Sequence, residues 1–455
     1  MQAEGIFLKA LFDRLNKSGV CYAVMRNYEL LPDTAGGSDL DLIASPENKV
    51  LVKAVLLAAI QAAGGVPIGI IEIAGYFKVN VLGRTPTAPQ QWWGLSIDVN
   101  IGLYFKGNRA ISEASIWPID TYRGIAVLPD SFAGLLGILK EVVLNNGTLP
   151  ARYAESARRC AKTEWQQIEK LLAPLSRPAL YQLKNLLLAD LFPEKIQVAC
   201  LNLRRTILHQ TLSLQSVKPL CRRLAYECTK VRRYLKPSGI VIAILGVDGA
   251  GKSTLINSIL PALNMATHNK IIVKHLRPSL FPPLARLKGS QAIPAGPVLE
   301  PHGSIPSGVV GSLLRLTYLT MDYILGYWFV IRPKIAKEPT VVIFDRYAYD
   351  MMLDPRRFRI GLPGWCAGFF ASLAPKPDLI FCLYAEPAVI AERKRELPIE
   401  ETRRQVEALR SFARNEPSAV LIPTDVSIEA TRDQVLQSLI EFFYRRRANN
   451  EAQHG

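Results

Sequence analysis

The sequence predicts an α/β protein whose C-terminal half is a parallel sheet with helices on both faces. An apolar stretch at residues 240–245 runs into a glycine-rich turn, which opens a helical pattern over residues 252–260. Strand and helix patterns then alternate to about residue 444, as in successive βαβ units. Residues 130–237 show helical periodicity only. We therefore predict three parts: a small α/β domain at 1–129, a helical connector at 130–237 and the parallel-sheet domain at 238–455.

Individual elements follow from apolar spacing and from turn residues. In the first part we expect helices over 4–19 and 46–64, and strands over 20–25, 40–44, 72–82 and 95–101. In the connector we expect helices over 132–145, 151–172, 177–191 and 194–212. In the third part we expect strands over 240–245, 271–276, 340–344, 378–384 and 419–423, and one charged helix carrying residues 393–404. The apolar stretch 316–331, which contains Asp322, predicts a buried core helix that is short for a membrane span.

Composition limits the class of protein. The chain has 455 residues, of which 49% are hydrophobic, so sizeable cores are expected. Its seven cysteines form no C-x-x-C pair, which argues against a disulfide framework or a zinc site and favours a reducing compartment. The N-terminus lacks a basic region followed by an apolar core, so no secretory leader is expected. These features predict a cytoplasmic protein.

Positive charge is concentrated in one stretch, residues 204–236. The formal net charge of the chain is +16, which favours anionic partners. Nine of the lysines and arginines lie in this stretch, with Glu227 as its single acid. Two interpretations stay open: a solvated helix face, or a peripheral contact with an anionic membrane or another polyanion.

The glycine turn has the spacing of a phosphate-binding loop. Residues 246–254 read Gly-Val-Asp-Gly-Ala-Gly-Lys-Ser-Thr, a G-x-x-x-x-G-K-S match between a strand and a helix. Loop amides and the helix N-terminus favour a polyphosphate such as that of ATP. Lys252 is expected to reach the β- and γ-phosphates, and Ser253 to hold Mg²⁺. The predicted nucleotide-binding residues are Gly246, Asp248, Gly249, Ala250, Gly251, Lys252, Ser253 and Thr254. The alternative, a glycine turn that only packs a helix on a sheet, does not explain Lys252 and Ser253 together.

Other charged residues fit a nucleotide site. Asp345 and Arg346 follow a buried strand, where a carboxylate can orient Mg²⁺ and an arginine can face the phosphates. A helix N-cap is the alternative role for Asp345. Further along, Arg393 and Arg395 lie on the charged segment, which either closes over the phosphates or forms an ordinary solvated face.

A second group of acids lies near the N-terminus. Asp39 and Asp41 are two residues apart on a predicted strand and therefore share a face, and Asp98 lies on another strand. Three carboxylates so placed are suited to bind Mg²⁺ for nucleotidyl transfer. A surface Asp-x-Asp turn is the alternative.

The C-terminal part resembles the thymidylate kinases over residues 238–445. The resemblance lies in the loop 246–254, in Asp345-Arg346-Tyr347, and more weakly in His275-Leu276-Arg277-Pro278 and Thr424-Asp425-Val426-Ser427. It implies phosphoryl transfer from ATP with Mg²⁺ near Ser253 and Asp345. It also implies acceptor contacts from Arg346 and Arg277, and a contact of Asp425 with the ATP base. Lys252 and the arginines 393 and 395 neutralise charge in this scheme.

The departures from that family lie on the acceptor side. Met321-Asp322-Tyr323 lacks the family's acceptor-binding arginine, and residues 348–357 replace a run that recognises thymine. The acceptor is therefore left open. A phosphate acceptor needs no general base, whereas a hydroxyl acceptor requires one, for which Asp248 or Asp350 is the candidate. The insert at 277–311 has no assigned role.

The N-terminal part resembles the polymerase-β-like nucleotidyltransferase superfamily over residues 15–130. The resemblance lies in Ser38-Asp39-Leu40-Asp41, with Asp98 as the later carboxylate. Where that superfamily has a Gly-Ser turn, this chain has Met25-Arg26-Asn27-Tyr28. Either Arg26 substitutes as a phosphate ligand, or the domain is catalytically weak.

Three functional hypotheses follow. The first is an ATP-dependent kinase acting on a nucleotide or another anionic or hydroxyl acceptor, since proteins with this pairing of domains resemble bacterial ones associated with surface-polysaccharide synthesis. The second is a genuine dTMP or nucleoside monophosphate kinase. The third is a nucleotide-gated binding module that docks on a membrane or a partner through residues 204–236. A homodimer is compatible with each.

Overall fold

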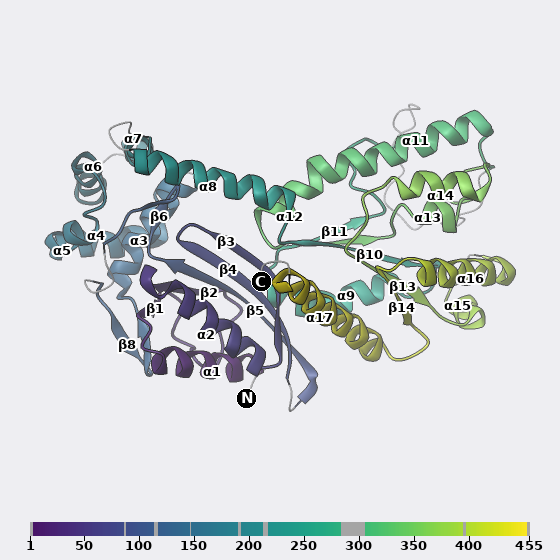
Figure 1. Ribbon diagram of the computed structural model, residues 1–455, viewed down its shortest axis with the longest axis horizontal. Coiled ribbons are helices and arrows are strands. Elements are labelled where there is room, and N and C mark those ends of the chain that lie inside the picture. Colours follow the sequence, from purple (N-terminus) through teal and green to yellow (C-terminus); the bar gives the residue numbers. More distant parts are fainter. Residues whose placement is uncertain are drawn as a thin grey trace. The chain divides into compact units, whose positions relative to one another are not determined.

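The predicted α/β class is confirmed by the computed structural model (Figure 1). It describes residues 3–85, 88–112, 117–145, 147–189, 193–212, 217–283, 305–394 and 397–452. The chain forms two compact units, Met1–Arg232 and Arg233–Gly455. Each unit is built around its own sheet, and each is described separately below.

The first unit contains a seven-stranded mixed sheet of order β3-β4-β5-β2-β1-β9-β8. Its strands are β1 (Tyr22–Val24), β2 (Leu40–Ala44), β3 (Gly65–Ile73), β4 (Tyr76–Thr85), β5 (Ala88–Ile101), β8 (Asp120–Tyr122) and β9 (Ile125–Val127). A separate ribbon joins β6 (Tyr104–Phe105) to β7 (Asn108–Arg109). Helices α1 (Ala3–Lys17) and α2 (Lys49–Ala62), preceded by the turn η1 (Pro46–Asn48), share a core with one face of the sheet. The parallel pairing of β2 with β5 sets Asp41 opposite Asp98.

The predicted strand over residues 72–82 is wrong in its bounds. Residues 65–85 form a hairpin, β3 paired antiparallel with β4, and the predicted strand runs through its turn. Gly75 in that turn has φ of 74°, a left-handed conformation that favours glycine. A Cβ there would lie 2.1 Å from Cδ2 of Tyr104, so the turn also requires the missing side chain.

Helices follow the sheet in the first unit. They are α3 (Asp130–Leu144), α4 (Ala151–Thr163), α5 (Trp165–Leu171), α6 (Arg177–Leu188), α7 (Pro193–Gln210) and α8 (Val217–Leu235). The last three residues of α8 fall in the second unit. The expected single helix over 151–172 divides at Glu164, whose φ and ψ of −129° and 28° are not helical. Buried residues of α3, α4, α6 and α7 share one core cluster with Ala23 and Ile43 of the sheet, so these helices cover its second face.

The second unit contains a five-stranded parallel sheet of order β11-β12-β10-β13-β14. Its strands are β10 (Ile240–Gly246), β11 (Ile271–His275), β12 (Val341–Asp345), β13 (Leu379–Tyr384) and β14 (Ala419–Pro423). Its helices are α9 (Lys252–Thr267), α11 (Val309–Gly326), α12 (Arg332–Lys337), α13 (Asp350–Leu353), α14 (Gly364–Ser372), α15 (Pro387–Arg393), α16 (Ile399–Asn415) and α17 (Ile428–Ala452), with a π-helical turn η3 at Tyr327–Ile331.

Helices cover both faces of this parallel sheet, as predicted. Val241 and Ala243 of β10 share a core cluster with residues of α11, α14 and α16. Because side chains alternate along a strand, Ile242 and Ile244 point to the opposite face, where α9 and α17 pack. The carboxyl ends of β10, β11, β12 and β13 therefore meet at one edge, which the helices leave open to ligands.

Two helix predictions in this unit require correction. The charged segment at 393–404 is not one helix, because α15 ends at Arg393 and α16 begins at Ile399. The stretch 316–331 is only partly buried, since Leu316 packs in the core whereas Phe329 is exposed. Among the described residues, no helix is long and apolar enough to cross a membrane.

Candidate functional site

A cleft of about 750 Å³ lies at the carboxyl edge of the parallel sheet in the second unit. The loop after β10 and the start of α9 contribute lining residues to it. Most of the predicted nucleotide and metal residues come together here. The lining residues are Asp248, Gly249, Gly251, Lys252, Ser253, Thr254, Leu255, His275, Asp345, Arg346, Arg357, Arg393, Lys394, Thr424, Val426, Ile428 and Thr431.

The loop conformation depends on two glycines. Gly249 and Gly251 have φ of 87° and 85°, in the region that favours glycine. A Cβ on Gly249 would lie 3.1 Å from Cβ of Lys394, whereas one on Gly251 would meet nothing within 4 Å. The backbone at Gly251 is therefore open to the cleft at the point where α9 begins. Amides of a first helical turn lack intrahelical acceptors, so this geometry fits a polyphosphate.

The side chain of Lys252 is hydrogen-bonded to the backbone of the glycine loop. Its Nζ donates hydrogen bonds to the carbonyl oxygens of Gly246 and Val247, at 2.7 and 2.9 Å, and the side chain is buried. Burial, reinforced by the positive charge of Arg346, lowers the pKa of Lys252 to about 8. A bound polyphosphate would place further negative charge beside this ammonium group and so favour its charged form.

Nucleotide affinity is therefore expected to depend on pH. An anion beside Lys252 favours its charged form. At a pH where Lys252 of the free protein is deprotonated, ATP binding therefore takes up a proton. Above about pH 8 the Kd of ATP should rise, approaching tenfold per pH unit. Calorimetry in buffers of different ionisation enthalpy would measure the proton uptake; a Kd and a proton count that stay constant between about pH 7 and 9 would contradict the assignment. The same depressed pKa makes the ligand-free fold more stable as pH rises from about 8 towards the ordinary lysine value.

Asp345 and Ser253 fit a magnesium ion. Oδ1 of Asp345 is buried without a hydrogen-bond partner in the described structure, and its Oδ2 lies 3.2 Å from Nδ1 of His275. Burial opposes ionisation of Asp345, but the His275 contact and the charge of Lys252 outweigh it, so the pKa of Asp345 lies below its usual value. Ser253 is exposed to the cleft at the start of α9. An ionised carboxylate with an unsatisfied oxygen, in the same cleft as a hydroxyl, offers the hard oxygen ligands that Mg²⁺ prefers.

Two arginines converge on Asp248. Its two carboxylate oxygens accept hydrogen bonds from Arg346 and Arg357 respectively, and Oδ1 lies 3.8 Å from Nζ of Lys252. Although burial opposes it, the cations around Asp248 hold the pKa of that carboxyl far below its usual range. Arg346 has φ of 72° and is nearly inaccessible to solvent. It also donates to Oδ1 of Asp350 at 3.0 Å.

Several predicted residues lie outside the cleft lining, as far as the described chain shows. Gly246 and Ala250 are buried in the loop and strand, and Asp425 lies between two lining residues. Asp350 is buried and accepts from the Tyr347 amide at 3.0 Å, so it supports Arg346 from behind. Burial raises the pKa of Asp350 despite that arginine.

Arg277 does not line the cleft and instead pairs with a buried carboxylate. Its Nη1 lies 3.1 Å from Oδ2 of Asp322, a fully buried carboxylate that also accepts from the Phe281 amide at 2.7 Å. Its acceptor contact stays a prediction. Asp322 thus anchors the segment after β11.

On the basic side of the cleft, Arg393 donates to the carbonyl oxygen of Thr424 at 2.7 Å and lines the cleft together with Lys394. Arg395 lies outside the described residues. Sequence reasoning missed Arg357 as a site residue. Only its place in the segment that departs from the thymidylate kinases could have pointed to it.

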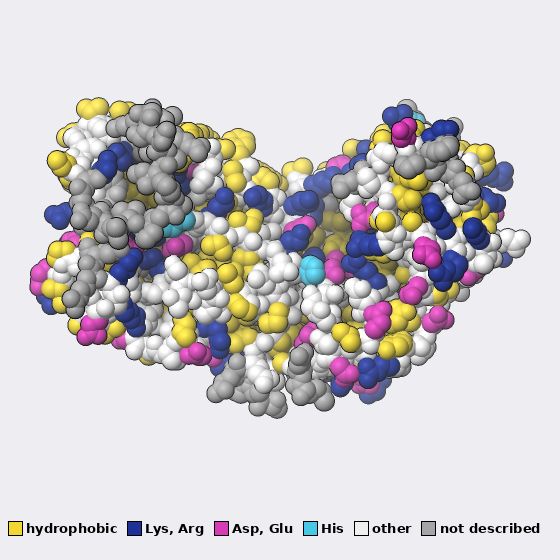
Figure 2. All heavy atoms as spheres, turned by 180° about the vertical axis from the view of Figure 1, so that it is seen from behind, with side chains coloured by type: hydrophobic (Ala, Val, Ile, Leu, Met, Phe, Trp, Pro, Cys, Tyr) yellow, Lys and Arg dark blue, Asp and Glu magenta, His cyan; other side chains and the backbone are white. Residues whose placement is uncertain are grey.

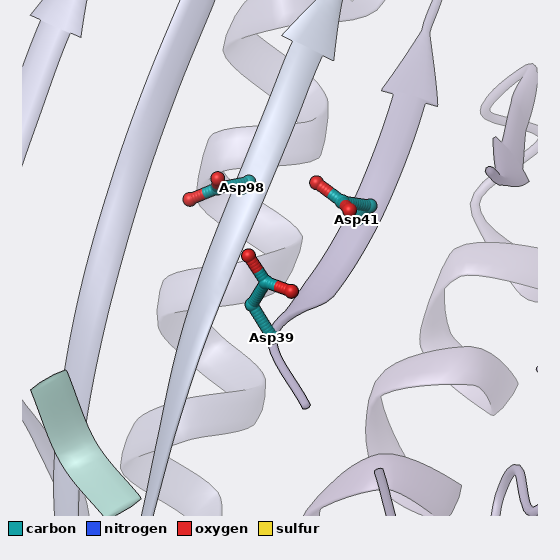
Figure 3. A group of neighbouring side chains, drawn as sticks. All are labelled: Asp39, Asp41 and Asp98. Atoms are coloured by element: carbon teal, nitrogen blue, oxygen red, sulfur yellow. The ribbon is translucent and has the colours of Figure 1, made fainter. Parts of the chain in front are cut away.

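The first unit brings Asp39, Asp41 and Asp98 together, with carboxylate oxygens all within 4.8 Å of one another (Figure 3). Asp41 and Asp98 come from the parallel strands β2 and β5, and Asp39 from the segment just before β2. Two cations form ion pairs with the group. Arg26 donates to Asp41 and, at 3.4 Å, to Asp39, while Nζ of Lys78 lies 2.9 Å from Asp98. Burial nevertheless raises the pKa of Asp41.

Removing Arg26 should strengthen metal binding at these carboxylates. A divalent cation must displace the Arg26 guanidinium from Asp39 and Asp41. We expect Arg26→Met to lower the Kd of Mn²⁺ by at least about tenfold, since one competing charge is lost. Electron paramagnetic resonance would measure free Mn²⁺, with Arg123→Met as a control that removes an exposed arginine away from the group. An unchanged or raised Kd would show that Arg26 does not compete with metal.

Comparisons with known proteins give only distant similarities to solved structures. No family model matches the chain, and no curated protein is significantly similar to it. Among solved structures, the chain is similar to thymidylate kinase from Ehrlichia chaffeensis, with 16% identity and a TM-score of 0.31. The match covers 45% of this chain and 100% of that one. With so low a TM-score, the function proposed below rests on the geometry of the cleft alone.

Proposed function

We propose that the second unit transfers the γ-phosphoryl group of ATP to an acceptor that carries an anionic group. One observation carries the proposal: the glycine loop, Lys252, Asp345 and Arg346 line a single cleft at the carboxyl edge of a parallel sheet. That edge is where open α/β sheets bind ligands. Phosphoryl transfer needs mainly positioning and neutralisation of charge, and these residues are of the types that supply both.

Each residue has a role in this scheme. Magnesium, when bound, would neutralise negative charge on the polyphosphate. Asp345 and Ser253 would hold the ion, and the loop amides would orient the polyphosphate. Lys252 would exchange two loop carbonyls for phosphate oxygens, which is possible because its ammonium group already lies beneath the loop. Arg393, which also lines the cleft, adds positive charge.

The geometry favours an acceptor that needs no general base. A general base works best with a pKa near the working pH. Asp248 is paired with two guanidinium groups and its pKa is far below that range. Asp350 is fully buried against Arg346. Neither carboxylate is placed to accept a proton from a hydroxyl acceptor. A phosphate monoester is already a nucleophile and needs no general base. Arg346 and Arg357 are suited to bind its oxygens.

An acceptor panel tests the proposal. The full chain is incubated with γ-labelled ATP, Mg²⁺ and separate nucleoside monophosphates, sugar phosphates and unphosphorylated sugars. We expect label on one phosphorylated acceptor. Strong dTMP turnover would favour the genuine nucleotide kinase, and label on a neutral sugar would overturn the acceptor class. ATP binding without transfer to any acceptor would favour the nucleotide-gated module. A role in surface-polysaccharide synthesis and nucleotidyl transfer by the first unit stay predictions.

Arg357 offers a selective test of the acceptor side. Arg357 contacts the glycine loop only through Asp248, from a partly exposed position, and among the described residues it forms no ion pair with Asp345. We expect Arg357→Met to raise the KM of the acceptor by about 10- to 100-fold, since a charge-assisted contact is lost, and to leave the Kd of ATP within about twofold. Steady-state kinetics and calorimetry separate the two. An equal loss of ATP affinity would place Arg357 on the nucleotide side.

A further inference from the structure

Helix α8 in the first unit exposes an apolar row along its whole length. The row repeats at intervals of four and three residues, the spacing that keeps side chains on one face of a helix. Its four aliphatic members are between 57% and 70% exposed, and its two cysteines are exposed as well. The members are Val217, Cys221, Leu224, Cys228, Val231 and Leu235. No residue of α8 is buried.

Packing contacts show which side of α8 faces its own unit. Nδ2 of Asn108 donates to the carbonyl oxygen of Pro219 at 3.3 Å, and Arg223 donates to Thr211 at 2.9 Å. Glu227 pairs with Lys106 on the same side. These contacts hold the helix by a face different from the apolar row. The row is therefore fixed outward and does not belong to the core of the first unit.

Cations run beside the apolar row. Lys218, Arg222 and Arg232 on α8, and Lys236 just after it, occupy positions next to the row and are exposed. The single acid of the stretch, Glu227, is engaged on the packed side by Lys106 and Lys230. Every exposed charged residue between 217 and 236 is thus a cation. The exposed face combines a narrow apolar row with a positive row.

This combination favours one of three possible occupants. If α8 paired with α8 of a second copy through the apolar row, the cations beside the row in one chain would approach and repel those of the other. A soluble polyanion such as a nucleic acid would satisfy the cations but leave the apolar row in water. An anionic lipid surface satisfies both, because apolar side chains enter the acyl boundary while lysines and arginines reach the headgroups.

We propose that the exposed face of α8 binds peripherally to a membrane surface rich in anionic lipid. The helix lies in the plane of the interface, with Leu224 and Val231 inserted and Arg222 and Arg232 among the headgroups. None of the residues of this surface lines the cleft, so the proposal does not depend on the function proposed above. A protein so placed would act at the membrane without spanning it.

Vesicle sedimentation of the full chain tests this. Vesicles are either phosphatidylcholine alone or about three parts phosphatidylcholine to one part phosphatidylserine. We expect binding only to the phosphatidylserine vesicles, and weaker binding as salt is raised. The affinity of the variant R222E/R232E for these vesicles should fall by at least about 25-fold, because each lost cation costs about fivefold. The variant L224E/V231E should lose binding to a similar extent, although it leaves every cation in place.

A charge-matched control addresses the high positive charge of the whole protein. Basic side chains are spread over the face shown in Figure 2, so non-specific attraction must be measured. The variant R158E/K162E makes the same change of net charge on the exposed side of α4 and should bind as the unaltered protein does. Melting temperatures and ATP binding verify that each variant is folded. A dye on Cys228, in protein carrying Cys221→Ser, should shift to the blue when vesicles are added.

Each remaining outcome counts against the proposal. Equal losses in R222E/R232E and R158E/K162E would show general electrostatic attraction, and full binding by L224E/V231E would show that the apolar row is not inserted. A second copy as occupant would appear without lipid, as a concentration-dependent dimer that Cys221 or Cys228 cross-links on mild oxidation. Heparin binding that survives L224E/V231E, without vesicle binding, would assign the surface to a polyanion.

Discussion

Replacing Lys252 by alanine should reduce phosphoryl transfer at least about 10³-fold in kcat. The ammonium group would contact oxygens whose charge changes during transfer, and such interactions contribute several kcal/mol to transition-state stabilisation. ATP should also bind more weakly, because a charge beneath the loop is removed. The fold should be retained, since the hydrogen bonds of Lys252 go to loop carbonyls, Asp248 keeps two arginine partners, and burial of the lysine as a cation is unfavourable. Single-turnover kinetics with labelled ATP would measure the loss.

The control is a lysine of the same unit outside the cleft. Lys270 follows α9 and forms a surface pair with Glu338 at 3.1 Å. Lys270→Ala should leave kcat and the Kd of ATP within about twofold. Turnover of Lys252→Ala within about tenfold of the unaltered protein would remove the central residue of the proposed site. The proposal would then be untenable.

Arg346→Met should have the largest effect on stability. Arg346 is the common partner of Asp248 and Asp350, and Asp350 is 2% exposed. Removing one partner of a buried ion pair leaves an uncompensated charge, so we expect unfolding free energy to fall by about 3–5 kcal/mol near pH 7. Chemical denaturation would measure it. Acceptor turnover should also fall, because the guanidinium group that faces the cleft is lost.

The pH dependence of this loss identifies its cause. Burial already raises the pKa of Asp350, and without Arg346 it rises further. A group whose folded-state pKa is raised destabilises the fold as pH increases from its unfolded value, near 4, towards its folded value. The deficit of Arg346→Met should therefore be smaller at about pH 5 than at about pH 7. Arg357→Met, which leaves Asp350 paired, should lose at most about 1–2 kcal/mol at either pH. Equal, pH-independent losses in both variants would contradict the buried pair.

The fold of the second unit was largely predictable. Its strands are apolar runs bounded by turn residues, and the predicted 419–423 coincides with β14. Prediction failed where the local pattern was ambiguous. Nothing in the periodicity of residues 65–85 marked Gly75 as a hairpin turn, and the break at Glu164 interrupts a continuous helical pattern. Such breaks are set by packing against other elements, which local spacing does not report.

The two sites differ in how much of them the sequence reveals. The phosphate-binding loop is a contiguous motif, so its residues and their chemistry could be assigned directly. The carboxylate group of the first unit required a guess about which strands are neighbours, and the structure brings Asp98 beside Asp41. Arg26 and Lys78 pair with these acids from other parts of the chain, and no sequence motif marks either residue.

The sequence by itself determined the α/β class, the position of the glycine loop and the identity of Lys252 and Ser253, because each depends on residues that are adjacent in the chain. Only the tertiary structure decided which charges meet. It set Arg357 against Asp248 and Arg277 against Asp322, and it turned the apolar row of α8 outward. Ion pairs and exposed faces arise between segments distant in sequence, so their geometry is fixed by how the layers pack and not by local spacing.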